Sequence, residues 1–218
     1  MGDRGAGGVP GKLMLGGAVA SLLVFLALTT VVTRHGLDHV DHVARALVHW
    51  YCCAPLQTSM EAASFLAGRP GQLMVVVFGS VLLWRRRRLW GLALPLVMAG
   101  AGLLQMIAKW AVDRPRPNLD PWGFPSAHVL TVVVLSGYIA YAIGTSRART
   151  GWRGFSLAIC AAIVGTVAFS RMYLDAHWFS DVLGGLTIGL AYLLAVVWLV
   201  GSTPALWEKL SLGRSPQG

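Results

Sequence analysis

Six long apolar blocks, separated by short polar segments, constrain the fold of this chain more than any other feature. The first block, residues 13–32, contains no charged residue. Twenty helical residues at about 1.5 Å each span about 30 Å, the thickness of one bilayer core. The other blocks cover residues 70–84, 89–110, 126–145, 155–170 and 182–201. Charged residues make up only 12% of the chain, about half of the usual share in a soluble domain. The sequence therefore predicts an all-α, polytopic membrane protein with about six transmembrane helices.

A cleaved signal peptide is the alternative interpretation of the first block. The apolar region of a signal peptide has about 7–15 residues and precedes a small-x-small cleavage site. Residues 13–32 form a longer run that ends in Leu-Thr-Thr-Val-Val, which favours a membrane anchor. The second block, residues 70–84, is short for a span, and residues before Pro70 could extend it. Its limits are therefore the least certain part of the six-span prediction.

Positive charges between the apolar blocks predict the orientation. With six spans, eleven basic residues fall on one face: Arg4, Lys12, Arg85, Arg86, Arg87, Arg88, Arg147, Arg149, Arg153, Lys209 and Arg214. Such a bias marks the cytoplasmic face. It also accounts for the net charge of +9, so no nucleic-acid partner is predicted. We expect cytoplasmic tails at residues 1–12 and 202–218, with a six-span domain at residues 13–201 between them.

The polar segment at residues 33–68 should lie on the opposite, extracytoplasmic face. It contains four histidines, His35, His39, His42 and His49. The first three share roughly one face of a helix, which invites a metal interpretation. The apolar side chains between them are more typical of an amphipathic helix that lies in the membrane interface. We therefore predict an interfacial helix here, and no metal or cofactor.

Most of the remaining charge lies in two segments that the six-span prediction places together on the extracytoplasmic face. The segment before the fourth block contains Lys109, Asp113, Arg114, Arg116, Asp120 and His128, and the segment before the sixth contains Arg171, Asp175, His177 and Asp181. Ionisable groups near the bilayer are costly and usually functional. A single cation could simply reach lipid head groups. Lys109, Arg116 and Arg171 together favour a phosphate site, because arginine presents a planar fork and lysine a compact charge.

Two histidines accompany these cations. Pro125 and Ser126 precede an apolar run, as at the start of a helix, so Ser126 should be the N-cap and the first free N–H groups should point at an anion. His128 lies in that first turn, although a plain capped helix with an interfacial histidine is the alternative. His177 and Asp181 are spaced i and i+4, and a carboxylate on one ring nitrogen leaves the other free to attack. The pattern predicts phosphoryl transfer, with one histidine as nucleophile and one as acid and base.

At these residues the sequence resembles the type 2 phosphatidic acid phosphatase family, whose core is shared with vanadium haloperoxidases. The family pattern consists of K-x6-R-P, P-S-G-H and S-R-x5-H-x3-D. This chain has Lys109-x6-Arg116-Pro117, then Pro125-Ser126-Ala127-His128, then Ser170-Arg171-x5-His177-x3-Asp181. The order and all the spacings agree. The resemblance covers residues 109–181 and is specific because all three motifs occur together.

The resemblance implies a helical, metal-independent phosphatase. It implies that His177 is the nucleophile, that Asp181 orients it, and that His128 protonates the leaving group and later activates water. Lys109, Arg116, Ser126 and Arg171 would bind phosphate, with backbone N–H groups near Ala127. One residue departs from the pattern, because Ala127 replaces a glycine. Alanine disfavours a positive φ, but it costs nothing in a helical turn, and we expect the position to be helical.

The implied function is hydrolysis of a lipid phosphomonoester or diphosphate through a phosphohistidine. Candidate substrates are a polyprenyl diphosphate such as undecaprenyl diphosphate, phosphatidate and phosphatidylglycerol phosphate. Two alternatives stay open: a phosphotransferase with the same first half-reaction, and a catalytically silent lipid-binding relative. The six spans argue against a soluble haloperoxidase. Lipid phosphate and membrane lipids are the predicted partners, and the sequence does not determine the oligomeric state.

Overall fold

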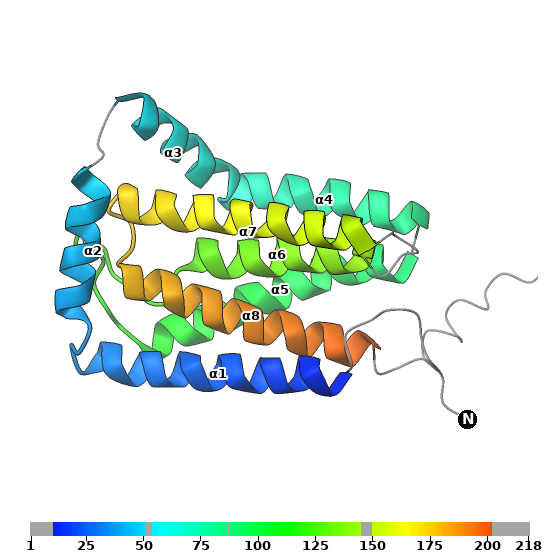
Figure 1. Ribbon diagram of the computed structural model, residues 1–218, viewed down its shortest axis with the longest axis horizontal. Helices are drawn as coiled ribbons and strands as arrows, with labels where there is room; N and C mark the ends of the chain where they lie inside the picture. Colours follow the sequence, from blue (N-terminus) through cyan, green and yellow to red (C-terminus); the bar gives the residue numbers. More distant parts are fainter. Residues whose placement is uncertain (1–10, 51–53, 87, 145–149, 202–218) are drawn as a thin grey trace, which may run out of the picture.

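The computed structural model describes residues 11–50, 54–86, 88–144 and 150–201, and all regular structure in these ranges is helical (Figure 1). The helices are α1 (Gly11–Thr33), α2 (Asp38–Trp50), α3 (Ala54–Leu66), α4 (Arg69–Arg86), α5 (Arg88–Ala111), α6 (Ala127–Gly144), α7 (Thr150–Tyr173) and α8 (Phe179–Gly201). Five of these, α1, α5, α6, α7 and α8, are long and apolar enough to cross a membrane, and there are six if the bent pair of α3 and α4 counts as one span. The predicted all-α membrane fold is confirmed. Apart from Gly11 and Lys12, which begin α1, the predicted tails lie outside the described residues.

The second span differs from the expectation, because it is broken. Pro55–Leu66 and Arg69–Arg85 meet at an angle of 54°. Proline restricts the residue before it and cannot donate to a continuing helix, so Pro70 favours the break. At Gly71 a Cβ would lie only 1.9 Å from the carbonyl oxygen of Leu66. Any residue larger than glycine would therefore clash with the backbone at this bend. The segment at 33–68, predicted as one interfacial stretch, is thus divided between α2 and the first half of this bent span.

Helix α2 lies across one end of the bundle (Figure 1). Its polar face is turned inward at Asp41, which is buried, while Val43, Leu47 and Trp50 are exposed. The exposed side therefore carries large apolar side chains beside His39 and His42, as expected for a helix in the membrane interface. Within the described ranges no group of three or more histidine, cysteine or acidic side chains is placed to hold a metal ion.

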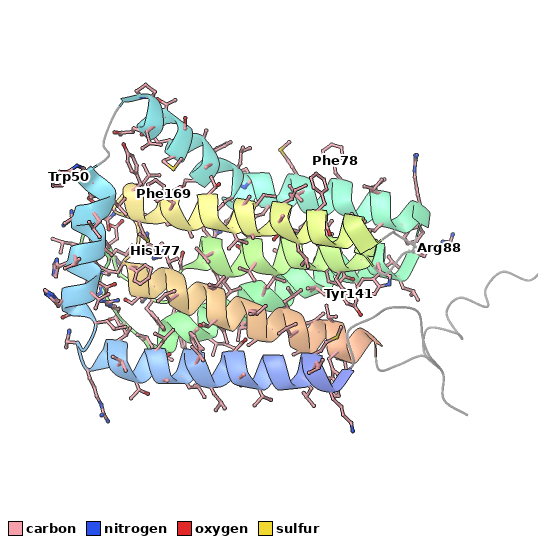
Figure 2. The ribbon with its side chains drawn as sticks, in the orientation of Figure 1. Trp50, Phe78, Arg88, Tyr141, Phe169 and His177 are labelled. Atoms are coloured by element: carbon pink, nitrogen blue, oxygen red, sulfur yellow. The ribbon has the colours of Figure 1, made fainter. Side chains whose placement is uncertain are left out.

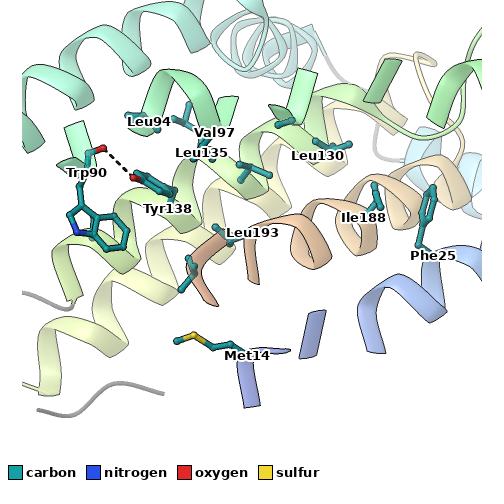
Figure 3. Packing of buried hydrophobic residues seen from close by; sticks show 14 of the residues in the cluster. Met14, Phe25, Trp90, Leu94, Val97, Leu130, Leu135, Tyr138, Ile188 and Leu193 are labelled. Atoms are coloured by element: carbon teal, nitrogen blue, oxygen red, sulfur yellow. Dashed lines mark hydrogen bonds between the residues drawn. The ribbon is translucent and has the colours of Figure 1, made fainter. Parts of the chain in front are cut away.

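The core lies around α6, whose buried side chains contact α5 and α8 (Figure 3). Leu94, Leu130 and Tyr138 are fully buried, and the Tyr138 hydroxyl donates a hydrogen bond of 3.1 Å to the carbonyl of Trp90. Helix α8 approaches α6 through a glycine: a Cβ on Gly185 would lie 2.5 Å from the carbonyl oxygen of Ser126. This contact brings the N-terminal part of α8 against the start of α6, beneath α2.

Candidate active site

The two charged segments predicted to meet do so at the end of the bundle covered by α2. The indole Nε1 of Trp178 donates a hydrogen bond of 3.0 Å to the carbonyl of Pro115. The backbone N–H of Ser126 donates one of 2.9 Å to the carbonyl of Asp181. These two bonds join the α5–α6 segment to the α7–α8 segment. All the sequence-predicted site residues come from these segments or from the helix ends beside them.

His177 and Asp181 form a buried pair at the start of α8. His177 precedes the helix and Asp181 lies in its first turn, and the His177 Nδ1 is 3.3 Å from Asp181 Oδ2. The same carboxylate oxygen accepts the backbone N–H of Trp178 at 3.0 Å. A carboxylate accepts hydrogen bonds only, so Nδ1 carries the proton and Nε2 retains its lone pair. The predicted pairing of these two side chains is therefore present.

Burial keeps the imidazole of His177 uncharged at neutral pH. Removal from water lowers the pKa of His177 to about 4, although the hydrogen bond to Asp181 acts in the opposite direction. The positive charges of Arg171 and Lys109 also lower this pKa. An uncharged imidazole with a free Nε2 is the form that can attack phosphorus.

Two of the predicted phosphate-binding cations end the spans that lead into the site. Lys109 lies in the last turn of α5 and donates to the carbonyl of Trp122. Arg171 lies in the last turn of α7 and donates to the Ser64 hydroxyl on α3. Cations stabilise the carbonyl end of a helix dipole, which helps to explain why these helices place them at their C-termini.

Unsatisfied polar atoms mark the space between these residues. Among the side chains that the structure describes, Arg116 Nε, Arg171 Nε and Ser126 Oγ are buried and have no hydrogen-bond partner. Buried polar groups nearly always have partners in folded proteins. Ser126 occupies the predicted N-cap position, and its carbonyl accepts the first helical bond from Leu130. Its hydroxyl, however, caps nothing, which corrects the predicted side-chain cap. All three atoms are suited to the oxygens of a phosphate.

Ala127 and His128 open α6. Residues with positive φ, apart from glycines, are His35, Leu119, Trp122 and Asp175 in the described ranges. Ala127 is not among them and is the first residue of the helix. The prediction that alanine fits a helical position is confirmed. His128 is half-buried and lies within Coulombic range of His177, Arg171, Arg116 and Lys109. Its Nε2 also lies beside the α3–α4 break, 3.7 Å from where a Cβ on Gly68 would be.

The structure adds two residues to which sequence reasoning gave no role. Arg114 donates from one terminal nitrogen to Asp181 Oδ1 at 3.0 Å and from the other to Asp41 Oδ2 at 2.7 Å. In the sequence, Arg114 is one of several charges in a loop, and Asp41 is one acid in an amphipathic helix. No spacing links residues 73 positions apart, so the sequence offers no signal for this pair.

Asp175 belongs to a neighbouring contact rather than to the His177 pair. Its carboxylate accepts two hydrogen bonds from Arg45, at 2.7 and 2.8 Å, and lies 3.0 Å from His49 Nε2. The hydrogen bond from Arg45 lowers the pKa of Asp175, and that from His49 does so to a smaller extent. This contact fastens α2 to the loop that carries His177. Asp113 and Asp120 are exposed.

The comparisons with known proteins identify the family. Residues 90–203, more than half of the chain, match the sequence model of the PAP2 superfamily. The chain belongs to the PAP2 superfamily. The matched region contains the three motifs from which the resemblance was predicted, so that prediction is confirmed.

Individual PAP2 relatives agree with this assignment. Phosphatidylglycerophosphatase B of Bacillus subtilis is 29% identical over an alignment of 185 residues that covers 79% of this chain and 89% of the relative. Lipid phosphate phosphatase delta of Arabidopsis thaliana is 30% identical over 142 residues, covering 56% of this chain and 33% of the relative. The crystal structure of a transmembrane PAP2 type phosphatidylglycerolphosphate phosphatase from Bacillus subtilis superposes with a TM-score of 0.78. It has 24% identity and covers 85% of this chain and 96% of that structure, and it shows the same fold. This PAP2 protein is a multi-pass membrane phosphatase, a phosphoric monoester hydrolase.

Proposed function

We propose that this PAP2 protein hydrolyses the phosphomonoester of a membrane lipid through a phosphohistidine at His177. One observation carries the proposal. A buried, uncharged histidine paired with Asp181 lies in the same site as three buried polar atoms without partners, on Arg116, Arg171 and Ser126. These groups supply a nucleophile and ligands for the oxygens of its target.

The reaction proceeds in two steps. In the first, His177 Nε2 attacks phosphorus, the bond from phosphorus to the lipid oxygen breaks, and protonated His128 gives its proton to that oxygen. In the second, His128 takes a proton from water as the water attacks phosphorus, and the N–P bond breaks to release inorganic phosphate. Lys109, Arg116 and Arg171 hold the nonbridging oxygens, whose charge must be stabilised in both transition states. Asp181 supports the positive charge that develops on His177.

An apolar cavity beside the site supports a lipid substrate. It has a volume of about 620 Å³ and lies between α3, α4, α6 and α7. Ala63 and Ala67 line it and lie on either side of Ser64, whose hydroxyl binds Arg171. A hydrocarbon chain in this cavity would therefore enter the bundle close to the phosphate-binding cations. The relatives named above also act, by their names, on lipid phosphates.

Phosphatidylglycerol phosphate is our first candidate substrate. The relative that is named for this activity, phosphatidylglycerophosphatase B, aligns with this chain over 89% of the relative's length. Phosphatidate and a polyprenyl diphosphate are the alternatives. With purified protein in mixed micelles, we expect the fastest release of inorganic phosphate from phosphatidylglycerol phosphate. Release should continue in a chelator of divalent metals, because cations already surround the site, and vanadate should inhibit it as a phosphate mimic.

Trapping the covalent intermediate tests the chemistry. Brief incubation with phosphorus-labelled substrate and rapid quench should yield acid-labile, base-stable label on the protein. His177→Ala should abolish it, whereas His39→Ala, on the exposed part of α2, is the matched control and should not. Undiminished label in His177→Ala would contradict the proposal.

A cavity-filling variant tests the lipid site separately. Ile163 lines the cavity and Leu157, on the same helix, does not. Ile163→Trp should slow hydrolysis of a long-chain lipid but not of a short, water-soluble alkyl phosphate, and Leu157→Trp should affect neither. Equal effects on both substrates would argue against a chain in this cavity.

The site is proposed to face the extracytoplasmic side. Arg88 and His177 lie at opposite ends of the bundle (Figure 2). The arginines at residues 85–88, where α4 ends and α5 begins, support a cytoplasmic location for that end. Single cysteines at the exposed positions 85 and 119, in a variant that lacks the native cysteines, should be labelled from opposite sides of the membrane. Labelling from the same side would refute this orientation.

A further inference from the structure

We infer that Asp41, on α2, is a positioning residue for the active site, holding Asp181 and through it His177. Asp41 lies outside residues 90–203, the region matched by the family model. The inference rests on the proposed role of His177. It assigns to α2, which crosses the end of the bundle, a part in the chemistry as well as in the fold.

Asp41 is one of the most deeply buried charged side chains in the described part of the chain, with 1% of its surface exposed. Its Oδ1 accepts the backbone N–H of Ser180 at 2.8 Å. Its Oδ2 accepts the Ser180 hydroxyl at 2.7 Å and the Arg114 guanidinium at 2.7 Å. A buried carboxylate that accepts three hydrogen bonds is held in one orientation.

The first consequence is geometric. Ser180 lies in the first turn of α8, where a backbone N–H has no partner within the helix, and Asp41 supplies that partner from α2. Asp181 is the next residue, and its Oδ2 receives His177 Nδ1 at 3.3 Å. By holding the backbone N–H of Ser180, Asp41 therefore fixes the position of the residue directly before Asp181.

The second consequence is electrostatic. Arg114 bridges two carboxylates, because it donates to Asp41 Oδ2 and to Asp181 Oδ1. Its side chain is only 12% exposed, so water screens these charges weakly. Asp41 offsets the charge of Arg114 and leaves the negative charge of Asp181 available to His177. Without Asp41, an uncompensated guanidinium would lie against Asp181 while positive charge develops on the attacking imidazole.

A purely structural fastening of α2 is the rival explanation. Arg45 and His49 already fasten α2 to the loop before α8 through Asp175. The two explanations differ in one respect: a fastening acts on stability, whereas a positioning residue acts on the rate of the chemical step through Asp181.

The test is a double-mutant cycle on the full-length protein, read as single-turnover phosphoenzyme formation from nitrophenyl phosphate. Asp41→Asn should lower this rate roughly 10- to 100-fold, the range typical of removing an outer hydrogen-bonding residue that supports a functional histidine. KM should change less than about threefold, because Asp41 contacts none of the proposed phosphate ligands. In an Asp181→Asn background the same substitution should change the rate less than about threefold, since groups that act as one unit are not additive.

Asp38→Asn is the matched control, because Asp38 lies on the same helix, its side chain is 45% exposed, and it approaches Arg114 only at 3.5 Å. It should leave the rate within about twofold of wild type. The inference is wrong if Asp41→Asn lowers thermal stability but not the rate. It is also wrong if Asp41→Asn lowers the rate by the same factor in the Asp181→Asn background as in wild type. Should Asp41→Asn fail to fold, Ser180→Ala is judged by the same two criteria. It removes the hydroxyl that accepts a hydrogen bond of 2.6 Å from Arg114 and donates one of 2.7 Å to Asp41. Activity retained in His177→Ala would instead refute the proposed function.

Discussion

Replacing Gly185 by alanine should separate α8 from the start of α6 and slow the enzyme without removing any side chain of the proposed site. The new Cβ would lie 2.5 Å from the Ser126 carbonyl oxygen, 3.2 Å from Val129 Cβ and 3.3 Å from the Leu130 nitrogen. Ordinary contacts of a Cβ begin at 3.4 Å, and two of these three neighbours are backbone atoms that cannot rotate away. The two helices must therefore move apart by about 0.9 Å.

That displacement acts directly on the site. Ser126 donates its N–H to the carbonyl of Asp181 at 2.9 Å. The proposed phosphate-binding turn at the start of α6 would therefore shift relative to the proposed nucleophile His177 and its partner Asp181. A misplacement of about 1 Å can cost about 100-fold in rate, and overpacking typically costs about 1–3 kcal/mol of stability. We expect a fall in phosphoenzyme formation of roughly 10- to 100-fold, together with a lower Tm.

Gly165→Ala is the control for this prediction. Gly165 also lies within a membrane-spanning helix, but a Cβ there has no neighbour within 4 Å. It should keep wild-type activity and gain up to about 1 kcal/mol of stability from the better helix propensity of alanine. Equal activities of Gly185→Ala and Gly165→Ala, measured as single-turnover phosphoenzyme formation, would refute the close-packing argument.

Three further predictions concern the histidines and the loop before α8. His128→Ala should slow phosphoenzyme formation from an alkyl phosphate by about 10²–10⁴-fold, the usual value of general acid catalysis, but much less from nitrophenyl phosphate. Equal losses would mean that His128 binds phosphate and is not the acid. Because burial lowers the pKa of His177 to about 4, the rate of phosphoenzyme formation from nitrophenyl phosphate, which hardly needs the acid, should fall on the acidic side only as pH approaches 4. An acidic midpoint near 6.5 would contradict this. Arg45 lowers the pKa of Asp175 below 3.8, so their bond stabilises the protein above that pH and is lost on acidification. Arg45→Gln should cost about 0.5–1 kcal/mol at pH 7, and the difference in Tm should vanish once Asp175 is protonated.

The sequence by itself determined the class of fold and the phosphatase family. Apolar blocks of bilayer length specify spanning helices wherever they occur, because a buried backbone in lipid must satisfy its hydrogen bonds locally. The spacing of His177 and Asp181 is also local, and it predicted their contact correctly. Even the alanine at position 127 could be interpreted from the sequence, since proline and serine just before it indicated a helix start.

The tertiary structure alone decided what joins distant segments. Pro70 favours a break between α3 and α4, but the 54° angle between the two helices depends on how they pack against the rest of the bundle. The Ser126 hydroxyl is free of its own helix, although its position in the sequence predicted a cap. Asp41 binds Ser180, which is 139 residues away in the sequence. The two terminal nitrogens of Arg114 donate to carboxylates on different helices, Asp41 on α2 and Asp181 on α8. Such contacts depend on how the helices pack and not on any periodicity along the chain, which is why no pattern in the sequence predicts them.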